Sequence, residues 1–167
     1  RINAEKLGYH NVEFRYGDIE KLPISNSVAD VVVSNCVMNL VPDKLKAFTE
    51  TFRVLKPGGH FSISDIVLVG NLPEGLQKNA EMYAGCISGA IQKSEYLATI
   101  EKAGFVNLQI QKEKRIIIPT EILTEYLNKN EMSPLAKGDL GIFSITVYAK
   151  KPEALQSNKS YTHLEQK

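Results

Sequence analysis

The strongest constraint on the fold is a short run of β-branched residues, ADVVVSN, at positions 29–35. The run has no polar alternation, which is typical of a parallel strand covered on both faces. The segment that follows carries large apolar residues at helical spacing: Leu45, Phe48, Phe52 and Leu55. After it, HFSISDIVLV is predicted as a second strand. A strand, a helix and a strand in short order predict a right-handed βαβ unit, and therefore an α/β fold.

Segments on both sides extend this pattern. NVEFRYGD alternates Val12, Phe14 and Tyr16 with polar residues and is predicted as a strand. Gly8 is placed to end a preceding helix, since glycine adopts the left-handed conformation that helix ends require. Further along we expect helices at 73–83, at 94–103 with Ser94 as N-cap and Gly104 as terminator, and at 119–130. We also expect a strand at 106–118, a last, antiparallel strand at 143–149, and a frayed polar tail at 151–167.

Composition excludes several classes of protein. With 20 Lys+Arg against 19 Asp+Glu, the chain has no basic surplus for a phosphate backbone, so we expect no nucleic-acid partner. No apolar run approaches the roughly 18 residues that a membrane helix needs. Two cysteines are too few for a disulfide scaffold, and no signal peptide can be read, so a cytoplasmic location is expected. Because the chain opens with Arg1 in what reads as the tail of a helix, we expect it to be cut from a longer protein.

Two segments are predicted to lie at the carboxyl ends of strands, where ligands bind in open parallel sheets. In GDIEKLP, the carboxylate of Asp18 could accept from an exocyclic amine and Ile19 could line a slot for a flat ring; a plain turn is the alternative. In SNCVMNLVP, Cys36 is either a packed small residue or a thiol that faces the crevice. By contrast, LKPGGHF precedes a strand, so its glycines are interpreted as a helix stop and turn, with no phosphate role.

The second cysteine, Cys86 in YAGCISGAI, has the same two interpretations. The cysteines lie fifty residues apart in the sequence, so they form no CxxC redox or zinc-ribbon motif. The three histidines, His10, His60 and His163, show no ligand spacing with either cysteine. We therefore do not expect a closed zinc site.

Taken in order, these motifs resemble a known enzyme family. GDIEKLP, ADVVVSNCVMNLVPDK and FRVLKPGGHFSISDIV resemble class I S-adenosylmethionine-dependent methyltransferases. SNCVMNLVPDK followed by AEMYAGCISGAI is narrower and resembles arsenite S-adenosylmethionine methyltransferases, with a similarity that runs from about residue 4 to residue 150. The resemblance implies a Rossmann-like sheet with flanking helices, of strand order 3-2-1-4-5-7-6, that here lacks its first strands and carries a C-terminal α+β extension.

The resemblance also implies roles for individual residues. Asp18 would bind the adenine amino group of S-adenosylmethionine, Ile19 would line the adenine pocket, and Asn35 would lie near the cofactor. Cys36 and Cys86 match the two cysteines that hold trivalent arsenic in the family, which makes them the implied catalytic and arsenic-binding residues. The family's glycine-rich loop, its ribose-binding acidic residue and its additional N-terminal cysteines are not found in this chain.

The sequence thus predicts residues 1–117 as the C-terminal part of a methyltransferase domain, 118–150 as an extension that completes the sheet, and 151–167 as the tail. We expect the longer protein to methylate arsenite or its thiol conjugate, and this chain alone to be inactive. The alternatives are a small-molecule C-, N- or O-methyltransferase with structural cysteines and a non-catalytic As(III)-binding fragment. The strand at 31–34 would present an unpaired edge, so we expect it to pair with a second copy or with the strand at 12–16.

Overall fold

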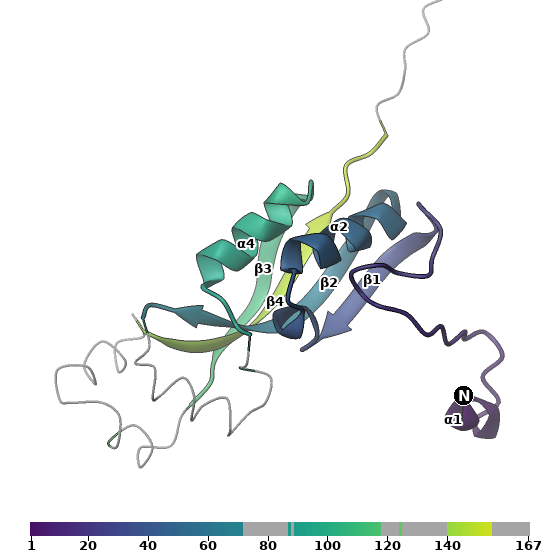
Figure 1. Ribbon diagram of the computed structural model, residues 1–167, viewed down its shortest axis with the longest axis horizontal. Coiled ribbons are helices and arrows are strands. Elements are labelled where there is room, and N and C mark those ends of the chain that lie inside the picture. The colour runs from purple at the N-terminus through teal and green to yellow at the C-terminus, as the bar shows by residue number, and fades with distance from the viewer. Residues whose placement is uncertain (72–86, 88, 118–123, 125–139, 155–167) are drawn as a thin grey trace, which may run out of the picture.

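The computed structural model describes residues 1–71, 87, 89–117, 124 and 140–154. In this part of the chain helices pack on one sheet, and the short N-terminal helix lies apart from it (Figure 1). The elements in chain order are α1 (Ile2–Lys6), β1 (Ala29–Asn35), the 3-10 turn η1 (Met38–Leu40), α2 (Lys44–Val54), β2 (Leu55–Val69), α4 (Lys93–Lys102), β3 (Val106–Arg115) and β4 (Gly141–Lys150).

The four strands form one mixed sheet of order β1-β2-β4-β3. β1 and β2 are parallel and joined through α2, while β4 pairs antiparallel with both β2 and β3. This confirms the βαβ unit and the antiparallel last strand. It also matches the 4-5-7-6 end of the predicted strand order.

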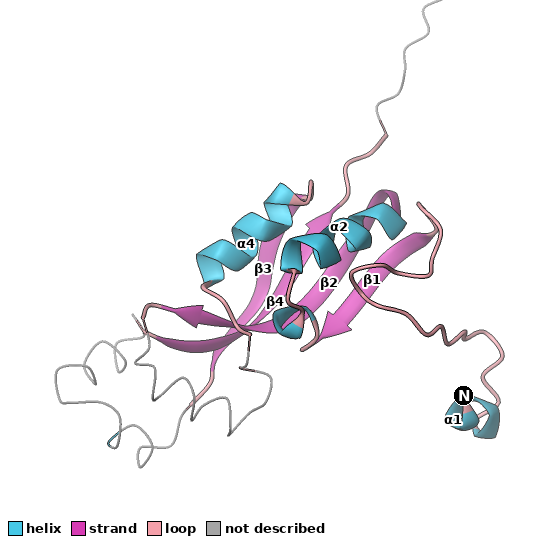
Figure 2. Ribbon diagram, viewed as in Figure 1, coloured by secondary structure: helices cyan, strands magenta, loops and turns pink. Residues whose placement is uncertain are grey.

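The helices α2 and α4 lie side by side on one face of the sheet (Figure 2). Alternate residues of β2 and β4 face them and are fully buried, among them Phe61, Ile63 and Val147. Aromatic rings fill the layer between sheet and helices: the Phe48 ring lies 5.9 Å from that of Phe61 and 5.6 Å, edge-on, from that of Tyr96. Such contacts add to the burial energy and fix how the helices dock.

Local sequence signals account for several boundaries of these elements. α2 begins after Asp43, whose carboxylate accepts the Lys46 N–H at 2.9 Å as an N-cap. Gly8 and Gly104 have positive φ just beyond α1 and α4, as predicted for helix terminators. The turn expected at KPGG instead lies inside β2: Gly58 has φ +78°, and the register between β1 and β2 shifts there, so that residues 56–59 bulge out of the ladder.

Three expectations about these described elements are wrong. Residues 12–16 form no strand, because none of the described strands lies beside them to complete a ladder. β1 is not covered on both faces: it is an edge strand of the described sheet, and the Val33 side chain is 76% exposed. Ser94 does not cap α4, which begins one residue earlier at Lys93 with Gln92 as N-cap and no side-chain cap bond. The helices expected at 73–83 and 119–130 and most of the tail lie outside the described residues.

Candidate functional site

The candidate site begins where β1 ends. Asn35 is the last, exposed residue of the strand and pairs with Ser64 of β2. Cys36 follows with φ +54°, and its N–H donates to the Ser64 carbonyl oxygen at 2.8 Å. A left-handed conformation is uncommon for a residue other than glycine, and it turns the chain sharply out of the strand. Cys36 therefore stands at the carboxyl rim of the sheet, as the sequence predicted.

The half-buried Cys36 side chain packs against a small apolar cluster at this rim. The cluster is separate from the main core under the helices. Its buried members are Ile66, Leu68, Ile87, Ala90 and Ile142. Of these, Ile87 directly follows Cys86 in the sequence. The cluster that contacts Cys36 therefore includes the residue next to the second cysteine.

Residues 89–92 continue this contact along the rim. Gly89 has φ +80°, and a Cβ built there would lie 2.6 Å from the Asn39 carbonyl oxygen, so its backbone packs directly on the loop that follows Cys36. Further on, the Leu68 N–H donates to the Ile91 carbonyl oxygen at 2.9 Å. The segment after residue 86 thus runs beside β2, beyond the point where β1 ends. Cys86 itself lies outside the described residues.

The Asp18 turn is tied to the same rim. The Asp18 carboxylate accepts the Glu20 N–H at 2.9 Å, and the Lys21 N–H donates to the Asp18 carbonyl oxygen at 3.0 Å. Glu20 in turn accepts from the Asp43 N–H at 3.2 Å, at the start of α2. Ile19 is half-buried and packs against the main core. The start of α2 lies at the carboxyl end of β1. The Asp18 turn therefore lies at the same end of the sheet as Asn35 and Cys36.

A buried polar pair beneath the rim was not predicted from the sequence. Asp65 of β2 is 1% exposed, and the Tyr96 hydroxyl of α4 donates to its Oδ2 at 2.5 Å. Burial raises the pKa of Asp65 to about 6, although the Tyr96 hydrogen bond and the nearby N–H groups of Val37 and Asn39 act in the opposite direction. Burial and the Asp65 charge also raise the pKa of Tyr96. One signal of this pair was available in the sequence. Asp65 alternates with Phe61, Ile63 and Val67 along the strand, which puts its carboxylate at a core-facing position.

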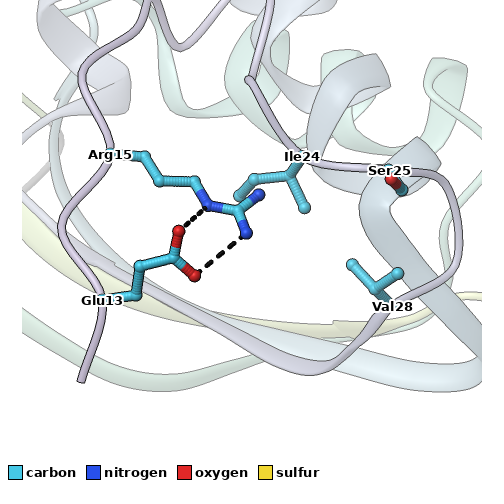
Figure 3. Close-up of a pocket in the computed structure, with 5 residues that line it drawn as sticks. All are labelled: Glu13, Arg15, Ile24, Ser25 and Val28. Carbon is cyan, nitrogen blue, oxygen red and sulfur yellow. Dashed lines mark hydrogen bonds and ion pairs between the residues drawn. The ribbon is translucent and has the colours of Figure 1, made fainter. Parts of the chain in front are cut away.

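A cavity in the described part of the surface lies away from this rim. Its volume is about 500 Å³, and it is lined by Glu13, Arg15, Ile24, Ser25 and Val28 (Figure 3). Val28 precedes β1 and Cys36 follows it, which separates them by roughly 25 Å of extended chain. In this cavity Arg15 is already paired with Glu13 at 2.6 Å. It is therefore not the predicted cofactor or arsenic site.

Two further observations concern metal binding and membrane-spanning helices. Within the described ranges, no group of three or more His, Cys, Asp or Glu side chains is placed to hold a metal ion. Among those same residues, no helix is long and apolar enough to cross a membrane.

The fold and the rim motifs together define a methyltransferase domain. Residues 1–104 match the family described as "Methyltransferase domain", so the chain belongs to that family. Within it, the chain is similar to proteins named arsenite methyltransferase, which confirms the resemblance stated from the sequence. The relative from Halobacterium salinarum is 37% identical over 154 residues, covering 91% of this chain and 37% of the relative. The human relative is 42% identical over 108 residues, covering 62% and 29%.

Solved structures agree with this assignment. An arsenic(III) S-adenosylmethionine methyltransferase from Chlamydomonas reinhardtii superposes with a TM-score of 0.68 at 29% identity, covering 90% of this chain and 48% of that one. A putative methyltransferase from Bacillus halodurans gives the same TM-score at 22% identity, which shows the shared fold. The predicted fold class is therefore confirmed. The chain spans less than half the length of these arsenite methyltransferases.

Proposed function

We propose that this protein takes part in methyl transfer from S-adenosylmethionine to trivalent arsenic, and that Cys36 and Cys86 hold the arsenic as thiolates. One observation carries the proposal: Cys36 packs against the same small cluster as Ile87, the residue next to Cys86. Ile87 directly follows Cys86 in the sequence, so the proposal assigns the second thiolate to the residue beside this cluster member. The similarity to arsenite methyltransferases supports the same substrate.

The chemistry of the two thiolates suits this substrate. Trivalent arsenic is soft and thiophilic, and soft metal centres favour sulfur ligands. Two thiolates hold arsenic while its lone pair stays available for attack on carbon, so no general base is needed at the arsenic. Catalysis then depends mainly on positioning, to which the fixed backbone around Cys36 contributes. The substrate is arsenite or a thiol conjugate of it.

The described residues fit the adenine end of the cofactor. Asp18 uses its carboxylate for one N–H of its own turn, and a carboxylate has about four lone-pair sites, so it retains capacity for an exocyclic amine. Ile19 beside it offers apolar surface, and Asn35 lies exposed at the end of β1. When bound there, S-adenosylmethionine supplies an electrophilic methyl group on a sulfonium.

The test is protection of the cysteines from alkylation. The chain is treated with iodoacetamide with and without arsenite, and labelling of Cys36 and Cys86 is measured separately by peptide mass spectrometry. We expect arsenite to protect both cysteines together, and Cys36→Ser or Cys86→Ser to abolish protection of the remaining one. Arsenate, which lacks the thiophilic trivalent centre, serves as the control ligand. Labelling that arsenite leaves unchanged would favour a small-molecule methyltransferase whose cysteines only pack.

A second assay separates catalysis from simple arsenic binding. We propose that the 167-residue chain alone binds S-adenosylmethionine weakly and methylates no arsenite, because it contains no GxGxxG loop. Joined to an upstream segment that carries such a loop, it should gain activity that depends on both cysteines. Arsenite protection without activity in the longer protein would support the non-catalytic alternative. The domain boundary at residue 117 and the cytoplasmic location stay predictions.

A further inference from the structure

Asp65 occupies a position where the fold calls for an apolar residue. It faces α2 and α4 from β2, in line with Phe61, Ile63 and Val67, which are all fully buried. Its Oδ1 accepts no hydrogen bond of standard geometry. Burying a carboxyl group is unfavourable unless its partners compensate, so packing alone does not account for Asp65.

The first partner of Asp65 is held rigidly from the opposite layer. The Tyr96 ring is 1% exposed, and it packs edge-on against the Phe48 ring. The core therefore fixes the ring without help from its hydroxyl. The 2.5 Å hydrogen bond to Asp65 Oδ2 then fixes the carboxyl group with respect to α4. A hydrogen bond to a charged group of this kind is stronger than a neutral one.

The other neighbours of Asp65 belong to the loop that follows Cys36. The N–H groups of Val37 and Asn39 lie close enough to the carboxyl group to lower its pKa. The residue before Asp65 acts on the same loop, since the Ser64 carbonyl accepts the Cys36 N–H at 2.8 Å. Two consecutive residues of β2 thus hold the loop from its first residue onward.

A charged group near Asp65 and Tyr96 also holds the loop after Cys36. Lys44, at the start of α2, donates from Nζ to the Val41 carbonyl at 3.0 Å, at the far end of the loop. Its charge interacts favourably with both Asp65 and Glu95 of α4. The loop is therefore held between the carboxyl group of Asp65 and the ammonium group of Lys44.

The loop needs such support because Cys36 has φ +54°. Residues other than glycine rarely adopt this region, and they keep such a conformation only when the surrounding structure enforces it. We propose that Asp65 and Tyr96 are positioning residues, which fix the loop 36–40 and thereby aim the Cys36 side chain toward bound substrate. The role in arsenic binding rests on the proposed function; the role in fixing the loop does not.

The test compares two tyrosine-to-phenylalanine variants of the 167-residue chain. Tyr96→Phe removes the hydroxyl that holds Asp65, while Tyr148→Phe, the matched control, removes one from the opposite face of the sheet, where the ring lies 5.1 Å from His60. Three quantities are measured well below the thermal midpoint: the rate of Cys36 alkylation, hydrogen exchange at Val37 and Asn39, and the arsenite concentration that half-protects Cys36. Asp65→Asn repeats the test without the negative charge.

We expect Tyr96→Phe and Asp65→Asn to change the alkylation rate and the two exchange rates several-fold and to raise the half-protecting arsenite concentration about tenfold. Tyr148→Phe should leave all three unchanged. A lower thermal midpoint for Tyr96→Phe with wild-type alkylation and exchange would show a purely structural pair and overturn the proposal. If arsenite does not protect Cys36 even in the wild type, the proposed function fails, while alkylation and exchange still decide whether the pair positions the loop.

Discussion

Gly89 packs so closely on Asn39 that a methyl group on its Cα would come within 2.6 Å of the Asn39 carbonyl oxygen. Its φ of +80° adds a conformation that alanine adopts only with strain. Gly89→Ala should therefore destabilise the chain by about 1–3 kcal/mol and push the segment after Cys86 away from the Cys36 loop. Urea denaturation and arsenite protection of Cys36 measure the two effects.

Gly104→Ala is the matched control for this substitution. Gly104, just after α4, also has positive φ, +100°, but its neighbour is the Phe52 ring of α2, away from the rim. Gly104→Ala should also lower the free energy of unfolding, because of its positive φ, but it should leave arsenite protection of Cys36 unchanged. Equal loss of protection in both variants would mean that general instability, and not the contact with Asn39, controls the site.

The raised pKa of Asp65 predicts a specific dependence of stability on pH. Its pKa is about 6 in the folded chain against an ordinary 3.8, so between these values the folded state binds more protons than the unfolded one. Stability from this group therefore falls as pH rises through that window. Asp65→Asn lacks this titration. Between about pH 4.5 and about pH 7, the free energy of unfolding of Asp65→Asn should therefore rise by about 2 kcal/mol relative to that of the wild type.

Urea denaturation at several pH values measures this difference. The other ionisable groups are common to both proteins, so their contributions cancel in the difference. A difference that stays constant with pH would show that Asp65 is ionised over the whole range.

Asp18 should matter to the cofactor more than to the fold. Its side chain accepts one local N–H in a half-exposed turn, so Asp18→Ala should change the free energy of unfolding by only a few tenths of a kcal/mol. Losing a hydrogen bond to the adenine amine should cost about 1–2 kcal/mol of S-adenosylmethionine affinity. Calorimetry on a longer protein with an upstream glycine-rich loop measures it. Asp30→Ala, which removes an exposed pair with Lys56, is the control, and equal affinities in the two variants would end the adenine role.

Local sequence patterns predicted the elements whose partners are close in the chain. The spacing of Phe48 and Phe52 predicted α2, whereas the turn expected at residues 56–59 is an irregular stretch inside β2, which begins directly after the helix. The strand expected at 12–16 failed because alternation predicts a strand only where a neighbour completes the ladder, and no local pattern reveals that neighbour. Cys36 was placed correctly at the strand end, whereas Asp65 and Tyr96 meet across 31 residues and only the folded core brings them together.

The last prediction concerns the two edges of the sheet. β3 carries Lys112, Glu113 and Lys114, and charged side chains discourage edge-to-edge pairing. β1 instead exposes Val31 and Val33, and no described segment pairs with its outer edge. The structure does not bring residues 12–16 against that edge, so the alternative of pairing within the chain is wrong, and pairing with a second copy stays the prediction.

We therefore expect the purified 167-residue chain to self-associate, with a sedimentation coefficient that rises with concentration. Val33→Lys should shift the equilibrium toward monomer, because a lysine ammonium at the β1 edge must be desolvated and repels its counterpart in the partner copy. Ile117→Lys makes the same chemical change at a side chain that is 84% exposed beyond β3, and it should have no effect. A wild-type chain that stays monomeric at all concentrations, or a dimer that Val33→Lys does not weaken, would rule out association through β1.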